Sequence, residues 1–159
     1  MKRVVCPGSF DPITYGHLDI IERASDQFDE VVVAVLANRT KSSLFSVQER
    51  MEMISQTTSQ FKNVRVDSWH GLLVEYCKEN SIHAIVKGLR AITDFDYELQ
   101  MAQINLQGSG VESLFMATSP GHSFLSSSIV KELAHYGGDV SSMVPGIVND
   151  ALKARVAGK

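Results

Sequence analysis

The sequence predicts an α/β fold: a doubly wound, five-stranded parallel sheet with helices on both faces. Short stretches rich in β-branched residues alternate with segments of helical period along the 159 residues of the chain. The stretch from Val31 to Leu36 is apolar throughout, which is typical of a strand buried on both faces in a parallel sheet. Together, these observations predict helices packed on either side of one parallel sheet.

Each expected strand is a short apolar run, and a helical segment follows it. The expected strands are 3–6, 31–37, 64–66, 84–86 and 113–117. The expected helices are 18–28, 47–59, 72–80, 94–106, 126–135 and 145–156. Ser46 and Glu49 have the spacing of a capping box, which predicts a firm start for the second helix. Pro145 suits the first position of the last helix, where a missing N–H costs nothing.

Length and composition predict one domain over residues 1–159, with C-terminal helices from about residue 126. The apolar fraction of 44% and the charged fraction of 21% are those of an ordinary globular protein. The net charge of -3 gives no general attraction to nucleic acid, and no apolar run approaches the roughly 20 residues that cross a bilayer. We therefore expect a cytoplasmic protein without a nucleic-acid or membrane partner.

The two cysteines are expected to be structural. Cys6 and Cys77 lie in apolar surroundings, form no C-x-x-C pair and have no histidine nearby at a metal-ligand spacing. Buried free thiols explain them best, and the sequence predicts no protein ligands for a metal ion.

The loop after the first strand carries the strongest functional signal, because ligands of such sheets bind beyond the carboxyl ends of the strands. Gly8 allows close approach of the backbone to a ligand, and the Ser9 hydroxyl can bind a phosphate oxygen. Gly16 and His17 are expected to open the next helix, whose N-terminus favours phosphate. An isolated Gly-His pair would indicate only a turn and a cap. Here G-x-F-D-P-x-T-x-G-H runs complete from Gly8 to His17.

Later loops add cations and hydroxyl groups. Lys87-Gly88-Leu89-Arg90 puts two cations around a glycine after the fourth strand, which indicates phosphate binding, with a solvated basic turn as the alternative. Lys41, after the second strand, follows the same logic with less specificity. Ser126-Ser127-Ser128 begins a late helix, where hydroxyl and backbone N–H groups can hold a triphosphate. Serines are also good N-caps, so capping alone is the alternative.

These motifs carry a resemblance. The first resembles the signature of the nucleotidylyltransferase superfamily, whose fold is Rossmann-like. The whole set resembles the bacterial phosphopantetheine adenylyltransferase family: P-G-S-F-D-P-x-T-x-G-H, then Lys41, then K-G-L-R-A-x-x-D-F-D-Y-E from Lys87 to Glu98, then S-F-L-S-S-S from Ser123 to Ser128. The resemblance covers nearly the whole chain, in order and at family spacing.

The resemblance implies an enzyme that transfers the adenylyl group of ATP to 4'-phosphopantetheine, forming dephospho-CoA and pyrophosphate in coenzyme A biosynthesis. His17 would stabilise the transition state without a covalent intermediate, and His17, Lys41 and Arg90 would neutralise charge on the phosphates. Mg²⁺ would be bound mainly through the ATP phosphates. The family also implies a homohexamer and inhibition by CoA.

The resemblance also assigns the binding residues. Those for the acceptor are Ser9, Lys41, Leu73 and Lys87. Those for ATP are Ser9, Phe10, His17, Gly88, Leu89, Arg90, Glu98, His122, Ser123, Phe124, Leu125, Ser126, Ser127 and Ser128. The family often has arginine where this chain has Lys87, and lysine offers a point charge without a bidentate fork, so acceptor affinity can differ.

Two other functions are compatible with the motifs. An enzyme of the same superfamily could act on nicotinamide mononucleotide or use a cytidylyl donor, although K-G-L-R argues against this. A regulatory module could bind ATP through the same loops without turnover.

Overall fold

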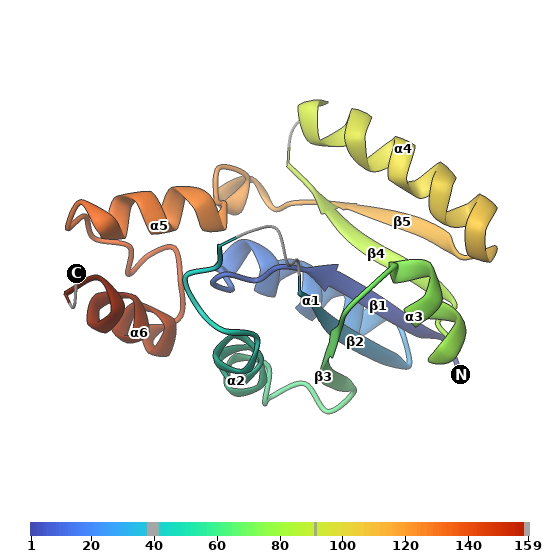
Figure 1. Ribbon diagram of the computed structural model, residues 1–159, viewed down its shortest axis with the longest axis horizontal. Helices are drawn as coiled ribbons and strands as arrows, with labels where there is room; N and C mark the ends of the chain where they lie inside the picture. Colours follow the sequence, from blue (N-terminus) through green and yellow to red (C-terminus); the bar gives the residue numbers. More distant parts are fainter. Residues whose placement is uncertain (38–41, 91, 158–159) are drawn as a thin grey trace.

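A five-stranded parallel sheet of order β3-β2-β1-β4-β5 forms the centre of the molecule (Figure 1). A computed structural model describes residues 1–37, 42–90 and 92–157, so Lys41 lies outside the described residues. Helices cover both faces of the sheet, which confirms the predicted fold class.

The helices and strands follow the predicted order. The strands are β1 (Arg3–Gly8), β2 (Glu30–Leu36), β3 (Val64–Trp69), β4 (Ala84–Leu89) and β5 (Glu112–Ala117). The helices are α1 (Tyr15–Gln27), α2 (Val47–Thr57), α3 (Leu73–Glu79), α4 (Ile92–Ser109), α5 (Ser127–His135) and α6 (Gly146–Ala157), with a 3-10 turn at Pro120–His122. The predicted capping box of Ser46 and Glu49 starts α2.

Some helices and strands are longer than the sequence predicts. β4 continues through the K-G-L part of the basic motif, because Lys87, Gly88 and Leu89 pair in register with β5. That motif was predicted to be a loop, and only Arg90 follows the strand. α1 begins at Tyr15, earlier than predicted, because Thr14 supplies the N-cap. Gly16 and His17 therefore lie within the first turn of α1.

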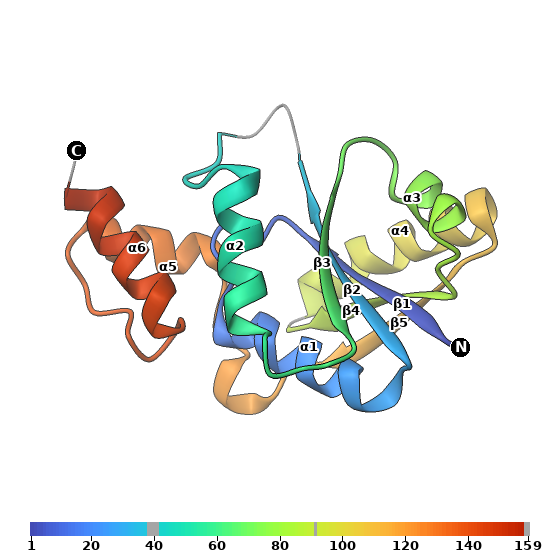
Figure 2. The same cartoon turned by 90° about the horizontal axis from the view of Figure 1, so that it is seen from below.

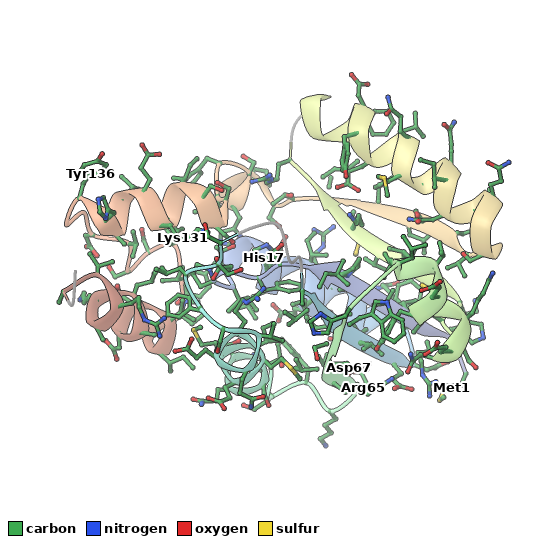
Figure 3. The ribbon with its side chains drawn as sticks, in the orientation of Figure 1. Met1, His17, Arg65, Asp67, Lys131 and Tyr136 are labelled. Atoms are coloured by element: carbon green, nitrogen blue, oxygen red, sulfur yellow. The ribbon has the colours of Figure 1, made fainter. Side chains whose placement is uncertain are left out.

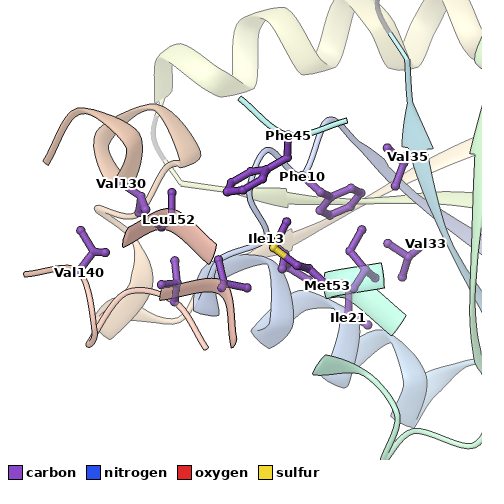
Figure 4. Close-up of a cluster of buried hydrophobic side chains, with 13 residues drawn as sticks. Phe10, Ile13, Ile21, Val33, Val35, Phe45, Met53, Val130, Val140 and Leu152 are labelled. Carbon is purple, nitrogen blue, oxygen red and sulfur yellow. The ribbon is translucent and has the colours of Figure 1, made fainter. Parts of the chain in front are cut away.

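Alternate residues of β2 serve different layers, as expected for a strand buried on both faces. Val33 and Val35 pack with α1, α2 and the C-terminal helices, in a cluster that includes Phe10 and Phe45 (Figure 4). Val32 packs on the opposite face of the sheet, with α3. Figure 2 shows α5 and α6 together at one end of the molecule, away from α3 and α4.

The strand order reverses between β1 and β4. From β1 the chain proceeds outward through β2 and β3, then returns to add β4 and β5 on the other side. In a doubly wound sheet a crevice opens beyond the carboxyl ends of the strands at such a switch point. Gly8 and Leu89 end the two central strands there.

Candidate active site

A cavity of about 480 Å³ lies at this switch point. Its wall includes the ends of β1 and β4 and the first turns of α1 and α5. Eleven of the described residues predicted for the site line it: Ser9, Phe10, His17, Lys87, Gly88, Arg90, Glu98, Leu125, Ser126, Ser127 and Ser128. The structure thus brings together side chains from four separate parts of the sequence.

Five described residues predicted for the site are not part of the cavity wall: Leu73, Leu89, His122, Ser123 and Phe124. Leu73 instead packs against the core cluster that contains Tyr76 and Cys77 on the α3 face of the sheet. His122 stacks on Tyr15, with ring centroids 6.3 Å apart. Three residues after His122, Leu125 is part of the cavity wall.

His17 is held in one orientation by the N-terminus of its own helix. The Thr14 backbone N–H donates to His17 Nδ1 at 3.0 Å, and the His17 backbone N–H donates to the Thr14 hydroxyl at 3.4 Å. Together these bonds form a reciprocal capping box. Because Nδ1 accepts a hydrogen bond, the neutral ring carries its proton on Nε2.

His17 is uncharged near pH 7. Burial of the ring, reinforced by the positive charge of Arg90, lowers the pKa of His17 to about 4. The ring of Phe10 meets it edge-on, with centroids 5.0 Å apart. The residue therefore offers an N–H donor to the cavity, and not the positive charge expected from the prediction that it neutralises phosphate charge.

Two glycines allow the elements around the cavity to pack closely. A Cβ atom on Gly88 would lie 2.9 Å from Cγ1 of Ile20, and one on Gly8 would lie 3.1 Å from the ring of Phe10. Gly88 thus lets α1 lie directly against β4, which keeps His17 near the basic end of that strand.

Lys87 and Arg90 bring positive charge to the cavity, and each has a partner in the structure. Lys87 Nζ lies 2.9 Å from Glu98 Oε2 and donates to Glu98 Oε1 at 3.2 Å. Arg90 donates to the Leu125 carbonyl oxygen at 2.8 Å, which ties the end of β4 to the segment before α5.

The three serines at the start of α5 have different surroundings. Ser126 is the N-cap and accepts a hydrogen bond from the Ile129 backbone N–H at 3.1 Å. The Ser127 hydroxyl donates to the Pro12 carbonyl oxygen at 2.7 Å. Ser128 is exposed at the cavity. The capping interpretation thus holds for Ser126, and all three serines still line the cavity.

Comparison with known proteins decides the family. A cytidylyltransferase-like family model matches residues 5–133. A phosphopantetheine adenylyltransferase of Streptomyces coelicolor is 61% identical over 156 residues, which cover 98% of this chain and 98% of that relative. Phosphopantetheine adenylyltransferases of Frankia casuarinae and Frankia alni are 59% and 58% identical, over 99% and 98% of this chain and equal shares of their own. The chain belongs to the phosphopantetheine adenylyltransferase family.

Membership of the phosphopantetheine adenylyltransferase family confirms the predicted family and enzyme class, a nucleotidyltransferase. A solved structure described as a nicotinate-nucleotide adenylyltransferase of Vibrio parahaemolyticus has a TM-score of 0.65 at 16% identity, covering 96% of this chain and 99% of that one. A lipopolysaccharide core biosynthesis protein of Thermoplasma volcanium has a TM-score of 0.53 at 26% identity, over 75% of this chain and 97% of that one. These structures share the fold.

A buried arginine that was not predicted from the sequence supports the first loop of this phosphopantetheine adenylyltransferase family member. Arg50, 4% exposed, donates to the Ser9 carbonyl oxygen at 2.7 Å and to the Ser46 carbonyl oxygen at 3.3 Å. The signal was a charged residue on the apolar side of α2, three positions after Val47 and four before Ile54.

Asp11 belongs to the recognised motif, but its role was not predicted. This buried carboxylate accepts hydrogen bonds from the backbone N–H groups of Leu44 and Phe45, both at 2.9 Å. Lys131 lies on α5 (Figure 3). Its Nζ is 3.0 Å from Oδ2 of Asp11. Asp11 therefore joins the first loop to two distant parts of the chain.

Asp19 was also missed. It accepts hydrogen bonds from the Ser119 hydroxyl at 2.8 Å and the Ser119 backbone N–H at 3.2 Å, which fixes α1 to the segment after β5. Burial opposes ionisation of this carboxyl, yet the bonds from Ser119 and Arg23 hold its pKa below the usual value.

The cysteines, the arrangement of metal-ligating side chains and the helix lengths were compared with the sequence predictions. Cys6 and Cys77 are free and buried as predicted, and burial raises the pKa of Cys6 to about 12 and that of Cys77 to about 11. Across residues 1–37, 42–90 and 92–157, no group of three His, Cys, Asp or Glu side chains is arranged to hold a metal ion. No helix in these ranges has both the length and the apolar character needed to span a membrane.

Proposed function

We propose that this cavity is the place where the adenylyl group of ATP passes to 4'-phosphopantetheine, with dephospho-CoA and pyrophosphate as products. The observation that carries the proposal is the fixed, uncharged His17 in a cavity that also contains Lys87, Arg90 and the N-terminal turns of two helices. A donor, two cations and the backbone N–H groups at the start of α5 suit a reaction between two phosphate-bearing molecules.

The chemistry needs positioning and electrostatic stabilisation. An oxygen of the acceptor phosphate attacks the α-phosphorus of ATP, and the bond from this phosphorus to the oxygen that bridges it to the β-phosphorus breaks. Pyrophosphate leaves with the electron pair. The acceptor phosphate, whose second pKa is about 6, is already largely a dianion near pH 7, so no protein base is needed. The task of the protein is to align the reactants and stabilise charge on the α-phosphate oxygens.

His17 supplies that stabilisation through Nε2–H. Because the Thr14 backbone N–H occupies Nδ1, the ring cannot rotate to present its acceptor nitrogen without losing the capping box. A preoriented donor costs no reorganisation when charge develops in the transition state. We assign the acceptor phosphate to Ser9, Lys87 and Lys41, of which Lys41 lies outside the described residues. Leu73 would lie close to the pantetheine arm.

We assign ATP to the other parts of the cavity. Within the cavity wall, Phe10, Gly88, Arg90 and Glu98 would form one side and the segment from Leu125 to Ser128 the other. Leu89, His122, Ser123 and Phe124, which lie outside that wall, would contact ATP from its flanks. The N-terminal turn of α5 offers backbone N–H groups to the phosphates. Mg²⁺ would enter with ATP, bound through its phosphates, and would neutralise charge on the leaving pyrophosphate.

We also propose a cytoplasmic homohexamer built from one domain per chain, with CoA as a feedback inhibitor at the same cavity. Exposed apolar side chains on α4 and β5 support self-association, because exposed apolar surface of this kind marks protein contacts. They are Phe95, Tyr97, Leu99, Ile104 and Leu106 on α4 and Leu114 on β5. Light scattering of the purified chain measures the oligomer, and turnover with added CoA measures the inhibition.

Pyrophosphate release tests the proposed reaction. We expect release from ATP and Mg²⁺ only when 4'-phosphopantetheine is present, together with one equivalent of dephospho-CoA. Release with nicotinamide mononucleotide, or with CTP as donor, would favour another nucleotidylyltransferase activity. ATP binding without release under any of these conditions would favour a regulatory module.

A further inference from the structure

Glu98 places a carboxylate in a cavity that is otherwise suited to anions. Its side chain is 19% exposed, and both of its oxygens lie near Lys87 Nζ, at 3.2 and 2.9 Å. Oε2 is buried, and across residues 1–37, 42–90 and 92–157 it has no hydrogen-bonding partner beyond the Lys87 ammonium with which it is ion-paired. A carboxylate at this position disfavours the binding of phosphate in the cavity, because the two negative charges repel each other.

The fold holds Glu98 against Lys87. Lys87 and Phe115 are register partners in β4 and β5, so their side chains leave the same face of the sheet. Phe95 on α4 packs edge-on against Phe115, with ring centroids 6.1 Å apart. Glu98 lies one turn after Phe95 and thus on the same side of α4. The aromatic contact fixes the helix, and the helix delivers the carboxylate to Lys87.

The ion pair competes with any phosphate that binds Lys87. An ammonium group satisfied by a carboxylate at 2.9 Å must turn away from it, or share its donors, to bind a second anion. A phosphate within reach of Lys87 Nζ also lies close to Glu98, in a partly enclosed site where screening by water is reduced. Both effects weaken phosphate binding.

We propose that Glu98 is an internal competitor for the acceptor phosphate and sets the affinity of the site for it. The proposal rests on the assignment of Lys87 to that phosphate in the proposed function. With substrate absent, Glu98 holds the Lys87 side chain in place. With substrate present, it keeps phosphate binding weak enough for the phosphate-bearing product to leave.

The test is direct binding of 4'-phosphopantetheine, measured by calorimetry. Glu98→Gln keeps the shape of the side chain and removes its charge, and we expect it to bind this ligand about tenfold more tightly than the parent protein. Pantetheine without the phosphate should bind both proteins equally. Glu98→Ala should reproduce the gain, which separates loss of charge from any new contact of the amide.

Asp96→Asn is the matched control. Asp96 is an exposed acid on the same helix and outside the cavity wall, so its neutralisation makes the same change in net charge. We expect no change in affinity for either ligand. Equal or weaker phosphopantetheine binding by both Glu98 variants, or an equal gain with Asp96→Asn, would overturn the inference.

Failure of the Glu98 inference and failure of the proposed function give different experimental results. If the parent protein forms dephospho-CoA but the Glu98 variants gain no affinity, the reaction stands and the competitor role falls. If the parent protein neither binds nor adenylylates phosphopantetheine, the proposed function falls, and with it the inference.

Discussion

The cavity has two walls of different construction. The first wall is the loop from Ser9 to Thr14 with His17, and it is held by groups that are themselves buried, Arg50 and Asp11. The second wall is formed by Lys87, Arg90 and Glu98. Its side chains are partly exposed. Lys87 and Glu98 form an ion pair, and Arg90 donates to the Leu125 carbonyl oxygen.

This difference separates two tasks. Contacts that involve backbone groups and buried partners leave the first wall few alternative conformations, which is what stabilisation of a transition state requires. Lysine and glutamate side chains with solvent access can exchange partners when a ligand arrives. We infer that changes in the first wall affect turnover and stability, whereas changes in the second affect affinity.

The largest effect is expected for His17→Ala. Removing the fixed donor should lower kcat by about 10²- to 10³-fold, as for other oxyanion donors. ATP affinity should change little, because the phosphates keep Arg90 and the N-terminal turn of α5. Steady-state turnover and calorimetric ATP binding measure both quantities. A loss of ATP affinity that accounts for the whole rate defect would place His17 in ground-state binding and remove the first wall from the chemistry.

Asp11→Ala should produce the largest loss of stability, about 3 kcal/mol in the free energy of unfolding. The change leaves two backbone N–H groups and the Lys131 ammonium without their common acceptor. Denaturant unfolding measures it, with Asp96→Ala on the exposed side of α4 as the control. Equal stability of the two variants would show that the first wall does not depend on Asp11.

Lys87→Ala should raise the KM for phosphopantetheine by about tenfold, the lower end for a lost charged hydrogen bond, with kcat within threefold of the parent protein. This pattern describes an interaction made equally in the ground state and the transition state. Initial rates at saturating ATP provide both constants. A fall in kcat of the size expected for His17→Ala would mean that the second wall also acts in the transition state.

The smallest effect concerns pH. The unfolded chain protonates His17 with a pKa near 6.5, whereas the folded chain does so only near pH 4, so in between the unfolded state binds more protons. Stability should therefore fall as the pH is lowered from about 6.5 towards 4, with a loss of about 1 kcal/mol by pH 5.5. His17→Gln should lack this part of the loss. Identical pH profiles for the two proteins would mean that folded His17 has an ordinary pKa.

The fold was predictable because its signals are local. Alternating apolar strands and helices, with caps such as Ser46, specify the order of elements residue by residue. The carboxyl end of β4 was predicted too early because pairing with β5, rather than local propensity, extends the strand through Lys87 and Gly88.

The candidate site was predictable to the extent that its residues form a motif. Ser9, Phe10 and His17 could be placed because they belong to one continuous motif, and the later motifs meet them at the same edge of the sheet. Arg50 and Asp19 could not be placed, because their partners lie at the distant residues Ser9 and Ser119. The charge state of His17 also depends on burial and on Arg90, which no spacing reveals.

The contact between Asp11 and Lys131 has a consequence for synthesis of the chain. The two residues are 120 positions apart in the sequence. Asp11, in the loop before α1, therefore cannot form its contact with Lys131 until α5 has been synthesised. Because chains are made from the N-terminus, the first wall stays incomplete on the ribosome until most of the protein has emerged. Nascent chains that end before α5 should therefore fail to retain nucleotide, and the ability to bind it should appear late in translation.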